Sequence, residues 1–167
     1  MKESDLSVHC RIETSDPEWV VDEENLTRLV RQCLELMQSD LVRVHGVRHA
    51  VGVSCFIVPA ERMRQLNNQH RQIDAPTDML SFPLGYAAPG TGWVLGDIVI
   101  CLDAVADKAG ASGNTLDDQL AFSLVHSLLH LVGYDHGSER DRGAMEAREE
   151  DVFGRLSVPT GVARRAA

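Results

Sequence analysis

TLDDQLAFSLVHSLLHLVGYDH, residues 115–136, has the pattern of a strongly apolar helix followed by a turn. Thr115 and Asp118 resemble a capping box, with Asp in the place of Glu, so we expect the helix to begin here and to reach about Val132. Leucine and valine cover most of its circumference, which predicts a helix packed inside a domain. One polar line interrupts this surface and consists of Gln119, Ser123, His126, Ser127 and His130.

The two histidines of this line are spaced for metal binding. His126 and His130 are four residues apart, so their imidazoles lie side by side on the helix and can chelate one ion. Gly133 can end the helix in a left-handed conformation and turn the chain, which brings His136 back toward the same ion. Three histidines leave a fourth position open for water, as in catalytic zinc sites. The segment therefore predicts a site for one zinc-like ion on His126, His130 and His136.

The same spacing occurs in the metzincin protease pattern H-E-x-x-H-x-x-G-x-x-H, apart from one residue. Ser127 stands where those proteases have the glutamate that acts as general base. A serine hydroxyl cannot replace a carboxylate in that role. A zinc protease is therefore a disfavoured alternative.

The flanking sequence predicts a mixture of strands and helices. Strand patterns cover residues 6–12, 50–58, 79–82 and 93–101, and helical patterns cover 22–37, a short stretch after Pro59, 102–109, 115–132 and 138–153. Pro83 is expected to stop the third strand. Residues 43–49 are predicted to form a basic linker, and residues 67–78 a polar loop.

These elements predict an α/β (α+β) fold, a single-domain sandwich with a small mixed sheet and about five helices. The metal site is expected at the C-terminal end of one helix, as in zincins. Residues 1–156 are predicted to form one catalytic domain. Residues 157–167 contain Pro, Gly and small residues and are predicted to be a disordered tail.

Composition limits the classes of function. The net charge of −9 and the pI of about 5.1 count against a broad basic surface that grips nucleic acid. A local basic groove is still compatible with this total, because five arginines fall in one half of the chain: Arg43, Arg48, Arg62, Arg64 and Arg71. The apolar runs are too short to span a bilayer, and the N-terminus has no secretory pattern, so we expect a cytoplasmic protein without a membrane partner. With no heptad pattern, a monomer is the default.

Three stretches resemble a known family. HSLLHLVGYDH (126–136), LNNQHRQIDAPTDMLSFP (66–83) and LGDIVI (95–100) are similar, in order and spacing, to the signature stretches of the YbeY-type endoribonucleases, the bacterial rRNA maturation factors. The resemblance covers roughly residues 51–153. The chain departs from the family's usual residues at Ser127 in place of Gly, His70 in place of Tyr, and Met79 in place of Val.

The resemblance implies one Zn²⁺ per chain and single-strand-specific RNA cleavage in 16S rRNA 3′-end maturation and ribosome quality control. It implies RNA of the small ribosomal subunit as partner and no DNA. By position, the metal ligands fall on the three histidines of the motif, and the family's important arginine falls on Arg71. A ribosome-assembly binding protein with a structural zinc remains an alternative.

Arg71 is predicted to offer its planar, charged fork to the phosphate that is cleaved. Asp97 and Asp135 are candidates for a general base, and Asp135 could equally orient a histidine. Attack by the 2′-hydroxyl of the RNA is also open.

Overall fold

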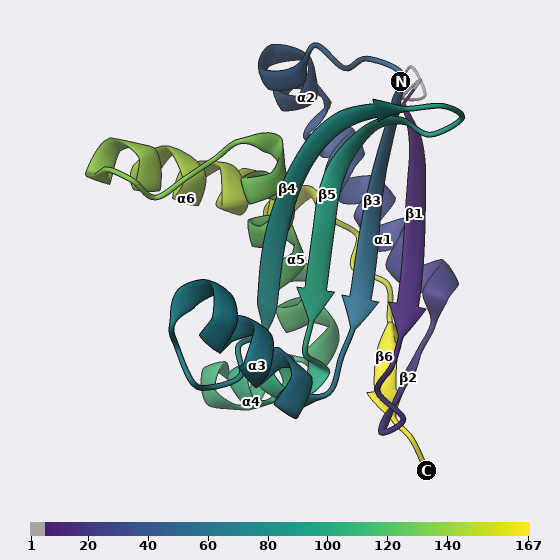
Figure 1. Cartoon of the computed structure of the whole chain (residues 1–167), viewed down its shortest axis with the longest axis vertical. Helices are drawn as coiled ribbons and strands as arrows, with labels where there is room; N and C mark the ends of the chain where they lie inside the picture. The colour runs from purple at the N-terminus through teal and green to yellow at the C-terminus, as the bar shows by residue number, and fades with distance from the viewer. Residues whose placement is uncertain (1–5) are drawn as a thin grey trace.

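The computed structural model describes residues 6–167. Its main sheet has four strands in the order β1 (Ser7–Thr14), β3 (Ala50–Ile57), β5 (Gly92–Ile100) and β4 (Met79–Ala88). The first three strands run parallel, and β4 runs antiparallel to β5 (Figure 1). The predicted mixed sheet in an α/β domain is confirmed.

Six helices lie in the described part of the chain: α1 (Glu23–Leu36), α2 (Gln38–His45), α3 (Ala60–Arg71), α4 (Leu102–Ser112), α5 (Leu116–Val132) and α6 (Glu139–Arg155). The helix beyond the expected five is α2, which includes the first part of the predicted basic linker. It forms because Leu41 is fully buried in the core, and it ends at Gly46, which has a φ of +68°. None of the described helices is long and apolar enough to cross a membrane.

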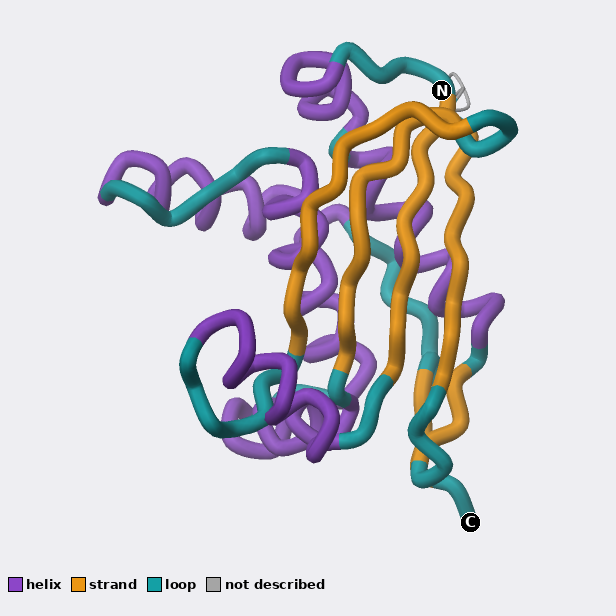
Figure 2. The backbone as a smooth tube through the Cα atoms, viewed as in Figure 1, coloured by secondary structure: helices purple, strands orange, loops and turns teal. Residues whose placement is uncertain are grey.

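Helix α5 lies between the sheet and the other helices. It contacts β4 and β5 on one side and α1, α4 and α6 on others, which explains why apolar residues surround it. Its predicted cap is present, since Thr115 accepts a hydrogen bond from the backbone N–H of Asp118 at 3.1 Å. Figure 2 shows the helices α1 and α5 behind the sheet, whereas α3 lies at the lower end of the sheet, toward the viewer.

Two predicted boundaries were wrong. Strand β4 continues past Pro83 to Ala88, because a proline is tolerated on an edge strand and the register shifts between Pro83 and Tyr86. Helix α3 continues through Arg71, where a polar loop was predicted. Asn67 explains this extension, because it is buried and donates a hydrogen bond from Nδ2 to the carbonyl of Ala75 at 2.8 Å.

The disorder predicted for residues 157–167 was also wrong. This segment contains β6 (Ala163–Arg165), which pairs antiparallel with β2 (Trp19–Val21). Val162 is fully buried, and the Asp117 carboxylate accepts hydrogen bonds from the backbone N–H groups of Gly161 and Val162 at 2.8 and 2.9 Å. These partners are distant in sequence, so small-residue composition alone did not reveal them.

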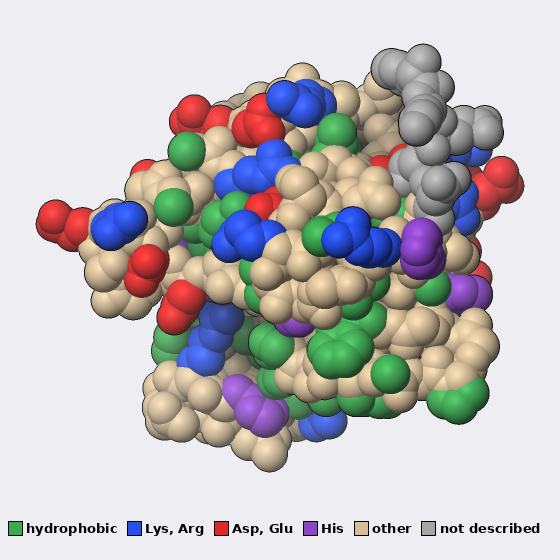
Figure 3. All heavy atoms as spheres, turned by 90° about the horizontal axis from the view of Figure 1, so that it is seen from above, with side chains coloured by type: hydrophobic (Ala, Val, Ile, Leu, Met, Phe, Trp, Pro, Cys, Tyr) green, Lys and Arg blue, Asp and Glu red, His purple; other side chains and the backbone are tan. Residues whose placement is uncertain are grey.

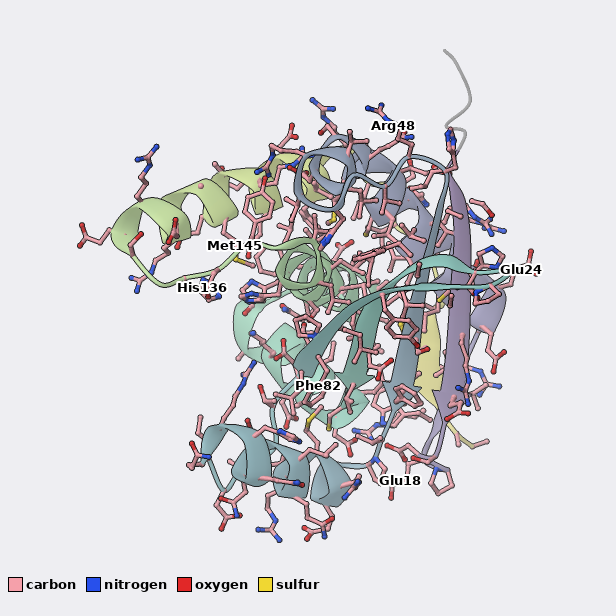
Figure 4. All side chains as sticks on the ribbon, turned by 45° about the horizontal axis from the view of Figure 1, so that its top comes forward. Glu18, Glu24, Arg48, Phe82, His136 and Met145 are labelled. Carbon is pink, nitrogen blue, oxygen red and sulfur yellow. The ribbon has the colours of Figure 1, made fainter. Side chains whose placement is uncertain are left out.

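The five arginines considered for a basic groove do not lie together on one surface. Figure 4 shows Arg48 at the opposite end of the molecule from α3, which carries Arg62, Arg64 and Arg71. Seen from above, acidic and basic side chains are interspersed (Figure 3). A groove built from all five residues is therefore excluded.

Candidate metal centre and its cleft

The three motif histidines converge at the end of α5. Nε2 of His130 lies 3.2 Å from Nε2 of His126 and 2.9 Å from Nε2 of His136. Helix α5 ends at Gly133, whose φ of +123° favours glycine and turns the chain back. Figure 4 places His136 in the connection between α5 and α6. The predicted turn brings the third imidazole to the first two.

The hydrogen bonds of the rings show whether a cation fits among them. Nδ1 of His126 contacts the carboxylate of Glu149, and Nδ1 of His130 donates to the carbonyl oxygen of Tyr134 at 3.0 Å. A carboxylate and a carbonyl only accept, so each Nδ1 carries the proton and each Nε2 carries a lone pair. Two lone pairs that face each other at 3.2 Å repel unless a cation lies between them. Two nitrogens that each bond a tetrahedral zinc at about 2.0 Å are separated by roughly 3.3 Å, so the three residues fit such an ion.

The protonation of His130 also favours metal binding. Its burial lowers the pKa below the usual value, and the neighbouring imidazoles of His126 and His136 lower the pKa further. A ligating histidine must be neutral, so the surroundings keep this ring in the form that binds a metal.

Glu149 belongs to the candidate site, although the sequence motifs did not point to it. It lies on α6, where its side chain is only 10% exposed, and it fixes the ring orientation of His126. Carboxylates that bind the second nitrogen of a ligating histidine have this role in zinc sites. A signal did exist, because Glu149 shares the buried face of α6 with Met145 and Val152. An acid on an apolar helical face indicates a specific partner.

A second set of contacts holds the loop after α5. The Tyr134 hydroxyl donates to Asp40 at 2.8 Å, and Arg148 donates to the other oxygen of Asp40 at 2.9 Å. Burial alone would raise the pKa of Asp40, but hydrogen bonds from Tyr134, Arg43 and Arg148 outweigh it and lower the pKa. The network ties α2 and α6 to the residue whose carbonyl orients His130.

The histidines open into a cleft, which we call the histidine cleft. Its walls come from α3, the segment at the start of β4, α4 and α5, and they consist of Arg71, Asp78, Met79, Ser81, Lys108, Phe122, Ser123, His126, Ser127 and His130. Arg71 thus lines the same cleft as His126 and His130, and its predicted role requires this proximity. Within residues 6–167 its guanidinium has no hydrogen-bond or ion-pair partner, whereas Arg43 and Arg64 are paired with acids.

Ser127 lies where the protease pattern has its glutamate. The side chain is buried, and its hydroxyl donates to the Met79 sulfur at 3.5 Å. This position therefore supplies no carboxylate to the cleft.

Within residues 6–167, neither aspartate considered as a general base forms a hydrogen bond to a ring of the histidine cluster. Asp97 lies on β5 between Gly96 and Ile98, and Ile98 packs in the core beside α5, so the side chain of Asp97 points to the opposite face of the sheet. There it lines a separate hollow with Arg11. Burial raises the pKa of Asp97, and the nearby Arg11 lowers it by less.

Asp135 accepts a hydrogen bond from the backbone N–H of His136 at 2.7 Å. The carboxylate therefore shapes the turn through the backbone. The orienting role that Asp135 was considered for falls to Glu149 and to the Tyr134 carbonyl.

Known proteins are similar to this chain in sequence and in fold. The family model described as Endoribonuclease YbeY matches residues 11–157. Relatives named Endoribonuclease YbeY include one from Pelotomaculum thermopropionicum, which is 37% identical over 83% of this chain and 91% of the relative. Another, from Moorella thermoacetica, is 37% identical over 87% of this chain and 96% of the relative.

The solution structure of TM1509 from Thermotoga maritima is similar with a TM-score of 0.54 and 27% identity, covering 87% of this chain and 89% of that one. The family model and the curated relatives span most of the residues that build the sheet, the cleft and the histidine cluster. The chain therefore belongs to the endoribonuclease YbeY family.

Proposed function

We propose that this protein is a metal-dependent endoribonuclease that cleaves single-stranded RNA, with one Zn²⁺ per chain on His126, His130 and His136. Its substrate is ribosomal RNA of the small subunit, and it acts in 16S rRNA 3′-end maturation and ribosome quality control. The names of the relatives support ribonuclease activity. We further propose a cytoplasmic monomer without DNA or membrane partners.

The observation that carries the proposal is the cluster of three Nε2 atoms at a cleft that His126, His130 and the unpaired Arg71 line. A bound zinc ion would supply Lewis-acid polarisation of a phosphate oxygen and a water of lowered pKa. Glu149 and the Tyr134 carbonyl hold two rings in the ligating tautomer. Arg71 offers two parallel N–H groups to the phosphate and so positions the phosphodiester against the histidine cluster.

Cleavage of a single-stranded RNA by the wild-type protein and by His130→Ala tests this function. Both proteins are purified in parallel and assayed with and without a chelator. We expect cleavage by the wild type alone, lost on chelation and restored by zinc. Equal cleavage by both proteins would refute the proposed metal chemistry, and no cleavage by either would favour a ribosome-assembly binding protein.

Arg71→Lys tests whether the arginine acts through its planar geometry or only through its positive charge. Lysine keeps the charge but loses the planar fork, so we expect a fall in kcat/KM of roughly tenfold or more with unchanged metal content. A variant as active as the wild type would remove Arg71 from the proposed mechanism.

A further inference from the structure

A second cation lies in the histidine cleft and was not singled out by the sequence motifs. Lys108 comes from α4, yet it lines the same cleft as Arg71, His126 and His130. Its side chain is 54% exposed, and its ammonium donates to the Asp78 carboxylate at 3.2 Å. The chain has 14 arginines and only two lysines, Lys2 and Lys108.

Asp78 is a firm anchor for this ammonium. The Ser123 hydroxyl donates to the same carboxylate at 2.7 Å, and the backbone N–H of Met79 donates to it at 2.9 Å. Burial alone would raise the pKa of Asp78, but the contacts with Ser123 and Lys108 outweigh it and lower the pKa. Asp78 therefore stays charged and holds Lys108 at the wall of the cleft. An ammonium has three N–H groups, so two remain for a ligand.

The position of Asp78, which Ser123 of α5 holds, shows where Lys108 lies along α5. Ser123 precedes His126 by three residues on α5, which is about 4.5 Å along the helix axis. Lys108 is therefore held beside the turn of α5 that precedes His126, and both residues line the cleft. Phe122 also lines the cleft and exposes part of its ring, on which a base can stack.

We infer that Lys108 is a phosphate-binding residue that contacts the phosphate next to the one held by Arg71 and the histidine cluster. The inference rests on the function proposed above, since it assigns a second subsite for the same RNA. It also explains how a chain with a net charge of −9 can hold a polyanion: two cations from different elements converge in one cleft, and no broad basic surface is needed.

Steady-state cleavage as a function of salt tests this subsite. Lys108→Gln removes one phosphate contact, so we expect KM to rise roughly tenfold while kcat falls much less. The slope of log(kcat/KM) against log salt should become shallower by about 0.7, the value for one contact on a single strand. Lys108→Arg should restore most of the slope. A Lys108→Gln variant with the wild-type slope and KM would overturn the inference and leave the proposed ribonuclease intact.

Arg28→Gln is the matched control. Arg28 is also 54% exposed and is paired with an acid, Glu24, but it lies on α1 and does not line the cleft. The substitution changes the net charge equally, so a loss of slope that is common to both variants would mean a general charge effect and would count against a subsite at Lys108.

Amine acylation gives a second readout that does not depend on turnover. Lys108 yields an acylated peptide that mass spectrometry assigns without ambiguity, since the only other lysine is Lys2. We expect single-stranded RNA to protect Lys108 from acylation, and excess salt to remove the protection. RNA that is cleaved in a metal-dependent reaction but leaves Lys108 fully reactive would contradict the subsite alone. Failure of the wild type to bind or cleave RNA would overturn both the subsite and the proposed function.

Discussion

Glu149 contacts His126 from a helix that follows the histidine motif in sequence, so we expect this one carboxylate to affect how well the cluster binds a metal. Glu149→Gln should weaken zinc affinity about 10- to 100-fold, because an amide orients the imidazole poorly and makes it less basic. Competition with a chromophoric chelator measures the affinity. Glu150→Gln is the control, because Glu150 is exposed on the same helix. Equal affinities for both variants would remove Glu149 from the site.

Asp97, in contrast to Glu149, is expected to be dispensable for the function of the site. Because its side chain lies on the far face of the sheet, Asp97→Asn should change kcat/KM on single-stranded RNA by less than about twofold. Initial rates at saturating zinc provide the comparison. A loss approaching that of His130→Ala would show that this carboxylate acts in cleavage after all.

At the scale of elements, Asp40 joins α2 and α6 to the loop after α5. Asp40→Asn should lower the free energy of unfolding by roughly 3 kcal/mol, because it leaves Arg148 without its buried partner. Urea unfolding of the metal-free protein measures the change. Glu24→Gln, in an exposed pair with Arg28, should cost less than about 0.5 kcal/mol.

The difference in unfolding free energy between the wild type and Asp40→Asn should depend on pH, because the pKa of Asp40 is lowered in the folded protein. A carboxyl whose pKa is lower in the folded state stabilises the fold above its unfolded pKa, about 3.9. That stabilisation is lost as pH falls through the folded pKa. The wild type and Asp40→Asn should therefore differ most near neutrality and converge in acid below about pH 4. A difference that persists unchanged in acid would mean that ionisation of Asp40 is irrelevant to stability.

The C-terminal segment that contains Val162 and β6 allows a further test of stability. Val162 is fully buried, so Val162→Ala should cost about 2 kcal/mol of unfolding free energy. Arg164→Ala, at an exposed position within β6, should be nearly neutral. Thermal or urea unfolding distinguishes the two variants. A neutral Val162→Ala would agree with the disordered tail that composition predicted.

Across the whole molecule, the sequence predicted contacts between residues that are close in sequence, and it did not predict contacts between distant segments. His126, His130, Gly133 and His136 lie within 11 residues, so helical periodicity and one turn suffice to place the metal centre. The strands of the main sheet were predictable from their apolar patterns, apart from the continuation of β4 beyond Pro83. Local pattern therefore predicted the elements that local residues determine.

Contacts between distant segments were beyond this reasoning. Glu149 reaches His126 across 23 residues, and Lys108 reaches Asp78 across 30. The face to which Asp97 points depends on which strands and helices pack together. Tertiary packing decides these features, and one sequence without its fold does not reveal them.

The proposed centre for one metal ion consists of three histidines, two of which are held in their ligating tautomers. Titration of the metal-free protein with zinc, monitored by calorimetry, tests it most directly. We predict one ion bound per chain and loss of this binding in His130→Ala. Absence of binding by the wild type, or equal binding by His130→Ala, would show that the three histidines do not form a metal centre.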